Sequence, residues 1–181
     1  MKISTVLNTD RLILRPWQLQ DREPFAVINR DPAVMQFMPG PLSAEESNAF
    51  VDRIETHFNQ HGFGLWAAQL RNPDQFIGYV GLAVPRFQAA FMPAVEIGWR
   101  LASDFWHRGL ATEGARAVVD HAFNVLELPA LVSFTVPANL PSRRVMEKIG
   151  MIHNPSEDFD HPLLPYGHPL RHHVLYRLNR T

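Results

Sequence analysis

A glycine-containing turn between an extended segment and a helix is the most informative chemical feature of the sequence. Residues 95–101 alternate as a strand does, Trp106–Ala111 follow, and the apolar stripe of a helix comes next. Gly109 permits a tight turn, so the amides of about residues 108–112 are expected to point outward at the start of the helix. Such amides and the positive end of the helix dipole favour an anion, above all a pyrophosphate. The alternative is that Gly109 serves only the turn.

Apolar periodicity predicts the elements that position this turn. Strands are expected over 11–17, 63–70, 75–84, 94–101, 131–136 and 170–178, and helices over 21–29, 43–62, 110–126 and 139–149. Ser43 and Glu46 have the spacing of a capping box, Asn139 is expected to cap the last helix and Gly150 to end it. Residues 154–169 are expected to be a loop. One mixed sheet covered by helices is the simplest packing.

Composition narrows the classes of function. The chain has 181 residues, a formal net charge of −1 and no cysteine. The length predicts one domain, and the near-zero charge argues against a nucleic-acid binder. The lack of cysteine excludes disulfides, thiolate metal sites and a cysteine nucleophile. Neither a signal peptide nor an apolar run of about 18 residues is found, so we expect a cytoplasmic protein that does not bind membranes.

Four segments occur in a characteristic order: Thr9–Arg15, Glu96–Trp99, Trp106–Glu113 and Asn139–Met151. Together they resemble the GNAT superfamily of N-acetyltransferases, in its branch of ribosomal-protein N-terminal acetyltransferases. The resemblance implies one α+β domain over residues 1–181, with a mixed, largely antiparallel sheet of about seven strands flanked by helices. It also implies transfer of an acetyl group from acetyl-CoA directly to a primary amine in a ternary complex.

The resemblance also implies where CoA is bound. The pyrophosphate would rest on the amides of residues 108–112, and the pantetheine would run along Ile97–Leu101 like an added strand. Family members have a bulge that splays this strand from the next, and Gly98 suits such a close approach. The expected contacts are Ile97, Gly98, Trp99, Arg100, Leu101, Trp106, His107, Arg108, Gly109, Leu110, Ala111, Thr112, Asn139, Ser142, Arg144 and Lys148. A solvated helix face is the alternative for Arg144 and Lys148, and a helix cap for Asn139.

Acetyl transfer to an amine requires two proton movements. An amine with an ordinary pKa of about 8 to 10.4 must lose a proton, and the departing thiolate benefits from a donor. The resemblance makes Glu96 the base, acting through a water, with an ordinary strand carboxylate as the alternative. Met146 stands where many members have a tyrosine, so the donor is expected at Ser142, or else at Tyr166 or Tyr176.

The acceptor side is expected to include the segment before Glu96 and the histidine-rich loop. Phe87 and Phe91 either line an acceptor pocket or pack in the core. Asp158 or Asp160 would attract a cationic amine, with Tyr166 as a further contact, and the alternative is that these are ordinary loop residues. The four histidines of residues 161–173 match no zinc pattern, so no metal is expected.

Two acceptor classes remain open at this point, a peptide or protein N-terminus and a small amine. A homodimer is also left open. The alternative function is a protein of the same fold that binds or senses acyl-CoA without turnover, since Met146 cannot donate a proton. These two functions can be separated by experiment. The protein is an enzyme if it transfers acetyl groups and if Glu96→Gln abolishes this transfer without loss of CoA binding.

Overall fold

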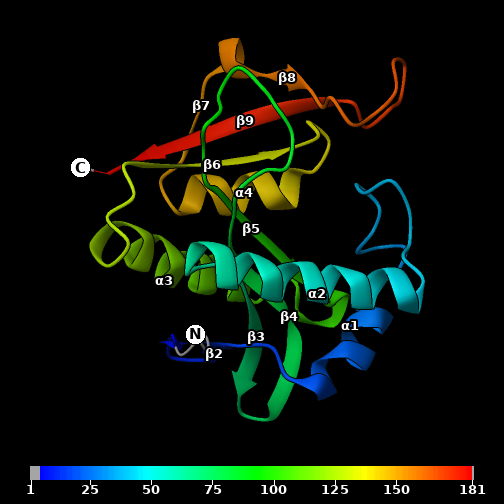
Figure 1. The fold of residues 1–181 in the computed structure, drawn as a ribbon, viewed down its shortest axis with the longest axis vertical. Helices are drawn as coiled ribbons and strands as arrows, with labels where there is room; N and C mark the ends of the chain where they lie inside the picture. The colour runs from blue at the N-terminus through cyan, green and yellow to red at the C-terminus, as the bar shows by residue number, and fades with distance from the viewer. Residues whose placement is uncertain (1–4, 181) are drawn as a thin grey trace.

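A computed structural model describes residues 5–180, and they form an α+β fold around one sheet (Figure 1). The strands are β1 (Leu7–Asn8), β2 (Leu12–Arg15), β3 (Leu65–Arg71), β4 (Asp74–Ala83), β5 (Glu96–Leu101), β6 (Ala130–Thr135), β7 (Ile152–His153), β8 (Phe159–Asp160) and β9 (His172–Asn179). The helices are α1 (Arg22–Ile28), α2 (Ala44–His61), α3 (Leu110–Asn124) and α4 (Leu140–Lys148), with short 3-10 helices η1 (Leu19–Asp21), η2 (Ser103–Phe105) and η3 (Pro155–Glu157). None of the helices in the described residues is long and apolar enough to cross a membrane.

The strand order is β1-β2-β3-β4-β5-β6-β9-β7, and β8 pairs with β9. The pair β5–β6 is parallel and the other neighbouring pairs are antiparallel. This confirms the mixed, largely antiparallel sheet that the sequence predicts. The structure has nine strands instead of about seven because β1, β7 and β8 contain two residues each, too few for alternation to reveal.

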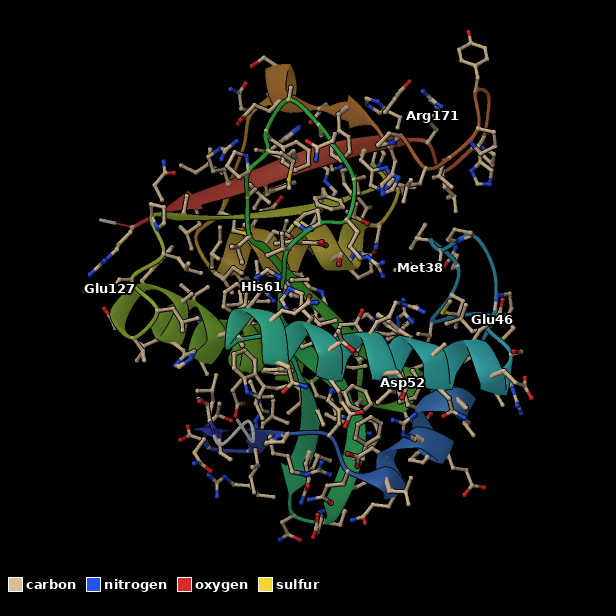
Figure 2. The ribbon with its side chains drawn as sticks, in the orientation of Figure 1. Met38, Glu46, Asp52, His61, Glu127 and Arg171 are labelled. Atoms are coloured by element: carbon tan, nitrogen blue, oxygen red, sulfur yellow. The ribbon has the colours of Figure 1, made fainter. Side chains whose placement is uncertain are left out.

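The helices cover the two faces of the sheet. On one face, α1 and α2 pack on β4, where Phe25 and Phe50 contact the ring of Tyr79. On the other face, α3 packs so closely that a Cβ at Gly114 would lie 3.2 Å from Val80. Figure 2 shows Glu46, Asp52 and His61 spaced along α2 across the front of the molecule. The loop between β4 and β5 crosses β6 and β9 in Figure 1.

The predicted helices are confirmed together with their caps. The Ser43 side chain accepts a hydrogen bond from the backbone N–H of Glu46, and the Glu46 carboxylate accepts one from the backbone N–H of Ser43. Asn139 Oδ1 accepts from the backbone N–H of Ser142 at 3.3 Å, which caps α4. Gly150 follows α4 with φ +90°, the left-handed conformation expected after a helix end.

The expectation of a continuous loop over 154–169 is wrong in two places. Residues 155–157 form η3, and β8 pairs with β9 through Phe159 opposite His173 and Asp160 opposite His172. The reason is that β7 covers only Tyr176 and Arg177 of β9, so the same edge offers free backbone groups at His172 and His173, with which β8 pairs.

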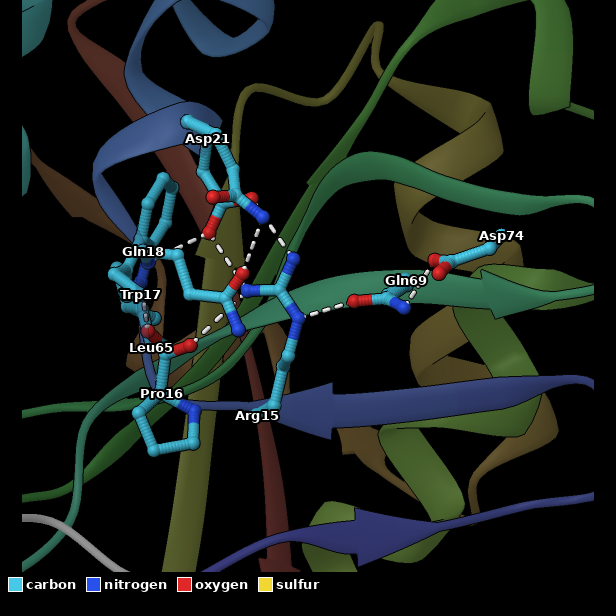
Figure 3. Close-up of polar contacts among 9 residues, drawn as sticks. Arg15, Pro16, Trp17, Gln18, Asp21, Leu65, Gln69 and Asp74 are labelled. Atoms are coloured by element: carbon cyan, nitrogen blue, oxygen red, sulfur yellow. Dashed lines mark hydrogen bonds and ion pairs between the residues drawn. The ribbon is translucent and has the colours of Figure 1, made fainter.

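A buried ion pair joins the N-terminal strand to α1 (Figure 3). Two parallel hydrogen bonds run from the Arg15 guanidinium to the Asp21 carboxylate, at 2.7 and 2.8 Å, and the Asp21 side chain is only 1% exposed. The same carboxylate accepts from the backbone N–H of Gln18 at 2.8 Å. Arg15 also donates to Gln69, so the pair connects β2, β3 and the start of α1.

Asp21→Asn tests how much this ion pair contributes to the free energy of unfolding. We expect it to lower the free energy of unfolding by roughly 3–5 kcal/mol, because it leaves the buried Arg15 charge without its partner. The matched control is Asp52→Asn, which removes an exposed partner of Arg22 and is expected to cost about 1 kcal/mol or less. Urea unfolding measures both, and equal losses would contradict the assignment.

Candidate active site

A slot opens in the sheet where β5 and β6 separate. All six residues of β5 pair with β4, but β5 and β6 share the single pair Glu96–Val132, beside which Val132 N–H donates to Val95 O at 2.9 Å. Successive residues of a strand direct their backbone groups to opposite sides. Val95 faces β6, and the pair Glu96–Val132 engages the N–H of Ile97 with Val132, so the C=O of Ile97 and the N–H and C=O of Trp99 face the slot.

The strands β5 and β6 separate as the resemblance implies, but the pairing of Ile97–Leu101 with β4 shows no bulge. The pairing of β4 with β5 runs without a shift, and a Cβ at Gly98 would meet only Glu96 Oε1, at 3.8 Å. The shift lies between β3 and β4, next to Gly78, whose φ is +133°. A Cβ at Gly78 would lie 2.0 Å from the carbonyl oxygen of Arg100, so glycine is required at this position and not at Gly98.

The two faces of β5 carry different groups. Trp99 points to the face of α4, where its indole N–H donates to Ser142 Oγ at 3.1 Å. Arg100 points to the face of α1, where its Nη1 donates to Asn29 Oδ1 at 2.6 Å. Of the expected CoA contacts on β5, Ile97 and Trp99 therefore present backbone groups to the slot. The backbone groups of Gly98 and Arg100 face β4 instead of the slot, and the Arg100 side chain points away from the slot toward Asn29.

The turn before α3 presents free amides. Gly109 is the N-cap residue of α3, with φ +78°, and no side chain caps the helix there. The first intrahelical bond runs from Glu113 N–H to Gly109 O at 3.0 Å, so the amides of residues 110–112 have no partner within the helix. His107 also has a positive φ of 59°, and His107 and Arg108 are exposed.

Three side chains from distant segments hold this turn in place. Arg11 donates to the carbonyl oxygen of Arg108 at 2.9 Å and to the Glu113 carboxylate at 2.7 Å. Thr9 Oγ1 donates to the same carboxylate at 2.5 Å. Burial acts to raise the pKa of Glu113, but hydrogen bonds from Thr9 and Arg11 outweigh it and lower the pKa. Sequence reasoning used Thr9–Arg15 only as a motif and assigned these residues no role.

Trp106 ties the turn to β5, because its indole N–H donates to the carbonyl oxygen of Leu101 at 2.9 Å. Beside the turn lies a groove of about 600 Å³, whose lining includes Arg11, Gly109, Arg116 and Lys148. The lining also holds the carboxylates of Asp10 and Glu113, and Glu113 pairs with Arg11, so Arg116, Lys148 and the helix N-terminus are the groups suited to phosphate. Arg144 is exposed on α4 and does not line the groove.

Glu96 is the titratable group at the closed end of the slot, where β5 and β6 are still paired. Burial raises its pKa from an ordinary 4.5 to about 8. Its carboxylate accepts no hydrogen bond from residues 5–180 that would counter this effect. A carboxylate with a pKa near the working pH is suited to general base chemistry.

Ser142 lies across the slot from β5, on α4. Its hydroxyl accepts from Trp99, so its own O–H remains free to donate. Met146 is 1% exposed and belongs to the core, which fits its inability to act as a donor. The Tyr176 hydroxyl is bonded to Arg143 and Glu147, and Tyr166 is 95% exposed. The Tyr176 hydroxyl is therefore already engaged and Tyr166 lies at the surface, so Ser142 is the donor candidate that the structure places beside β5.

An aromatic cluster borders the slot on the Glu96 face. Phe134 lies two residues after Val132, the partner of Glu96, so its side chain shares that face of the sheet. The other members of the cluster are Phe87, Phe91, Phe159, His161 and His173. All six rings are half-buried, and burial lowers the pKa of both histidines, which favours their neutral form.

The remaining acceptor candidates are placed differently. Asp158 Oδ1 accepts from His153 at 2.8 Å and from the backbone N–H of Leu175 at 3.1 Å, so this carboxylate already joins β7 to β9. Tyr166 lies on an exposed loop. Within the described residues no three histidine, aspartate or glutamate side chains are grouped so as to hold a metal ion.

Comparison with known proteins agrees with this geometry. The family model of the acetyltransferase (GNAT) domain matches residues 11–152. The chain belongs to the GNAT acetyltransferase family. The resemblance drawn from the four sequence segments is thereby confirmed, and GNAT acetyltransferases use acetyl-CoA as the acetyl donor.

Relatives of this GNAT protein include the uncharacterized protein YkkB of Bacillus subtilis, 33% identical, with 83% of this chain and 87% of that protein covered. The FsC-acetyl coenzyme A-N(2)-transacetylase of Aspergillus fumigatus is 31% identical, over 84% of this chain and 67% of that enzyme. Among solved structures, Mycobacterium smegmatis RimJ in complex with CoA-disulfide has a TM-score of 0.73 over 97% of this chain and 86% of that chain. Its sequence identity is 19%, so it shows a shared fold alone.

Gly109→Ala tests the turn of this GNAT protein against Gly167→Ala. Both glycines have a φ near +80°, so each alanine is expected to cost about 1–2 kcal/mol of stability. Only Gly109→Ala is expected to weaken CoA binding, because relief of its strain turns the amides of the α3 N-terminus away. Urea unfolding and calorimetric titration with CoA measure the two effects. Equal CoA affinity in both variants would show that the turn is not the anion site.

Proposed function

We propose that the protein is an N-acetyltransferase, formed as a single GNAT domain, that transfers an acetyl group from acetyl-CoA directly to a primary amine. The observation that carries this proposal is the placement of Glu96, whose burial-raised pKa is about 8, at the closed end of the slot between β5 and β6. The acceptor is a protein N-terminus or a small amine.

The residues around the slot fit acetyl-CoA. The amides of residues 110–112 would hold the pyrophosphate, and the groove with Arg116 and Lys148 would take the 3′-phosphate. The C=O of Ile97 and the N–H and C=O of Trp99 would pair with the pantetheine amides, as a neighbouring strand would. In each case unpaired donors or acceptors of the protein face a group of the opposite kind.

The two proton movements then fall to groups on opposite faces of β5. Glu96 removes a proton from the acceptor amine through a water, and the amine nitrogen forms its bond to the acetyl carbon. The carbon–sulfur bond breaks, Ser142 donates its hydroxyl proton to the departing sulfur, and the second proton, which the nitrogen loses on acylation, returns to the Ser142 oxygen through solvent. The Trp99 indole N–H occupies a lone pair of Ser142 Oγ, which leaves that hydroxyl as a donor toward the slot.

Glu96→Gln tests the base through its pH dependence. With an acceptor amine of pKa below 6, kcat/KM is expected to rise with pH and level off above about pH 8, because only ionised Glu96 accepts a proton. Glu96→Gln is expected to lose about 10²–10⁴-fold in kcat/KM and to lose this rise. Release of free thiol follows the reaction.

Stability and CoA affinity serve as controls. Because the pKa of Glu96 is raised in the folded state, ionisation destabilises the fold as pH rises from about 4.5 through 8, so Glu96→Gln gains stability relative to the parent over that range. A variant that keeps the parent pH profile would exclude Glu96 as the base. CoA binding without transfer to any amine would favour the non-catalytic acyl-CoA-binding alternative.

Ser142→Ala tests the proton donor. The change keeps the backbone N–H that Asn139 caps, so α4 is expected to stay intact. We expect kcat to fall by about 10²-fold or more, with CoA affinity within threefold of the parent, and Ser142→Thr to restore much of the rate. Steady-state kinetics and CoA titration measure these effects. An unchanged kcat in Ser142→Ala would assign the protonation to water.

A further inference from the structure

Arg100 is a half-buried cation on the same face of β5 as Glu96, and nothing in the acetyl-transfer steps uses it. Its guanidinium lies over the rings of Phe50 and Tyr79, at 5.5 and 5.7 Å from the ring centroids. Among residues 5–180, no carboxylate lies within ion-pair distance of it. A half-buried charge without a counter-charge is unusual, because burial costs free energy unless the charge is paired.

The hydrogen bonds of Arg100 are also incomplete. Nη1 donates to Asn29 Oδ1 at 2.6 Å, and the buried Asn29 is fixed in turn by its bond to Ser47 Oγ at 2.9 Å. Nε is buried and has no hydrogen-bond partner in the described residues. Nη2 makes no bond to them either, although solvent reaches it. One edge of the guanidinium is thus held by Asn29, and the Nε–Nη2 edge is free of hydrogen-bond partners among the described residues, with Nη2 open to solvent and Nε covered.

We propose that the free edge of Arg100 binds a carboxylate of the acceptor. Two parallel N–H donors match the two oxygens of a carboxylate, and no neutral group satisfies both as well. The acceptor class is therefore an amine that carries a carboxylate a few bonds away, as an amino acid or a peptide with an acidic residue near its N-terminus does. This inference rests on the proposed acetyl transfer.

The spacing along β5 suits such an acceptor. Gly98 lies between the base and the cation, and space above it is open. An amine above Gly98 is about 7 Å along the strand from the Cα of Arg100, at about 3.3 Å per residue, which the first atoms of an amino acid or peptide can span. Glu96 with its raised pKa is largely neutral at pH 7, so it does not neutralise Arg100.

Other charged groups near this face are already engaged. Asp31 accepts from Ser103 Oγ at 2.5 Å and from the backbone N–H of Ala33 at 2.9 Å. Arg53 lies over the same Phe50 ring as Arg100, at 5.4 Å, but it is exposed on α2. Arg53 is thus a matched control, because it carries the same charge and contacts the same ring but lies on the exposed surface of α2.

The experiment compares acceptors that differ only in the carboxylate. One pair is phenylalanine and phenylalaninamide, and the other is seryl-aspartyl-alaninamide and seryl-asparaginyl-alaninamide. For each pair, the ratio of kcat/KM for the charged to the neutral member is measured in the parent, Arg100→Gln, Arg100→Lys and Arg53→Gln. The ratio cancels losses of folded protein, and comparison with the parent cancels differences in amine pKa.

We expect Arg100→Gln to lower this ratio by about tenfold or more in at least one pair, Arg100→Lys to lower it less, and Arg53→Gln to leave it unchanged. The pair that responds tells whether the acceptor is an amino acid or a peptide. Transfer to both members with a ratio that Arg100→Gln leaves unchanged overturns this inference alone. Transfer to no acceptor, with CoA bound, overturns the proposed function instead.

Discussion

Backbone groups that are buried without partners cost free energy, and β5 carries such groups because β6 separates from it after the pair Glu96–Val132. The surrounding contacts confine this cost to a short stretch. The Trp106 indole satisfies the carbonyl oxygen of Leu101, and β4 pairs with the full length of β5. What stays unpaired is the stretch around Ile97 and Trp99, which is long enough for one strand-like ligand. The position of the slot in turn determines where the phosphate turn, the base and the proton donor must lie.

In the proposed reaction, groups on both faces of the sheet reach the same reacting centre, because the slot passes between two strands. Glu96 approaches from the face of α1 and α2, and Ser142 from the face of α4. A base and an acid that act on different atoms need no shared hydrogen bond, and the structure has none between them. This separation suits direct transfer, in which the nitrogen loses a proton on one side while the sulfur gains one on the other. A covalent acyl-enzyme would instead need a nucleophile and its base in contact.

The sequence predicts the elements of this fold well because local signals mark them. Ser43 with Glu46, Gly62 and Asn139 each fix a helix end through bonds within four residues. The strands β1, β7 and β8 were missed because they form only by pairing with a neighbour. The residues of the site are likewise divided into those that local sequence signals predict and those that only tertiary contacts reveal. The turn at Gly109 is readable from residue types, but the contacts of Thr9 and Arg11 with Glu113 span about a hundred residues of chain. The resemblance implies the separation of β5 from β6, but nothing in the sequence predicts the register shift beside Gly78, since pairing register is not encoded at a single glycine.

Burial of Glu96 affects two properties at once: the proton affinity of the proposed base and the net charge of the region where the acceptor would bind. If Glu96 kept an ordinary pKa, its carboxylate would be ionised at pH 7 and would attract a cationic amine, the form that cannot attack. The raised pKa leaves the carboxyl largely neutral, so the field of the cleft is set by Arg100, which lies about 13 Å along the same strand. A positive cleft repels a simple ammonium ion but accepts a zwitterion oriented with its carboxylate toward Arg100. The amine of that zwitterion then lies beside a base whose proton affinity is close to its own, so that deprotonation needs little driving force.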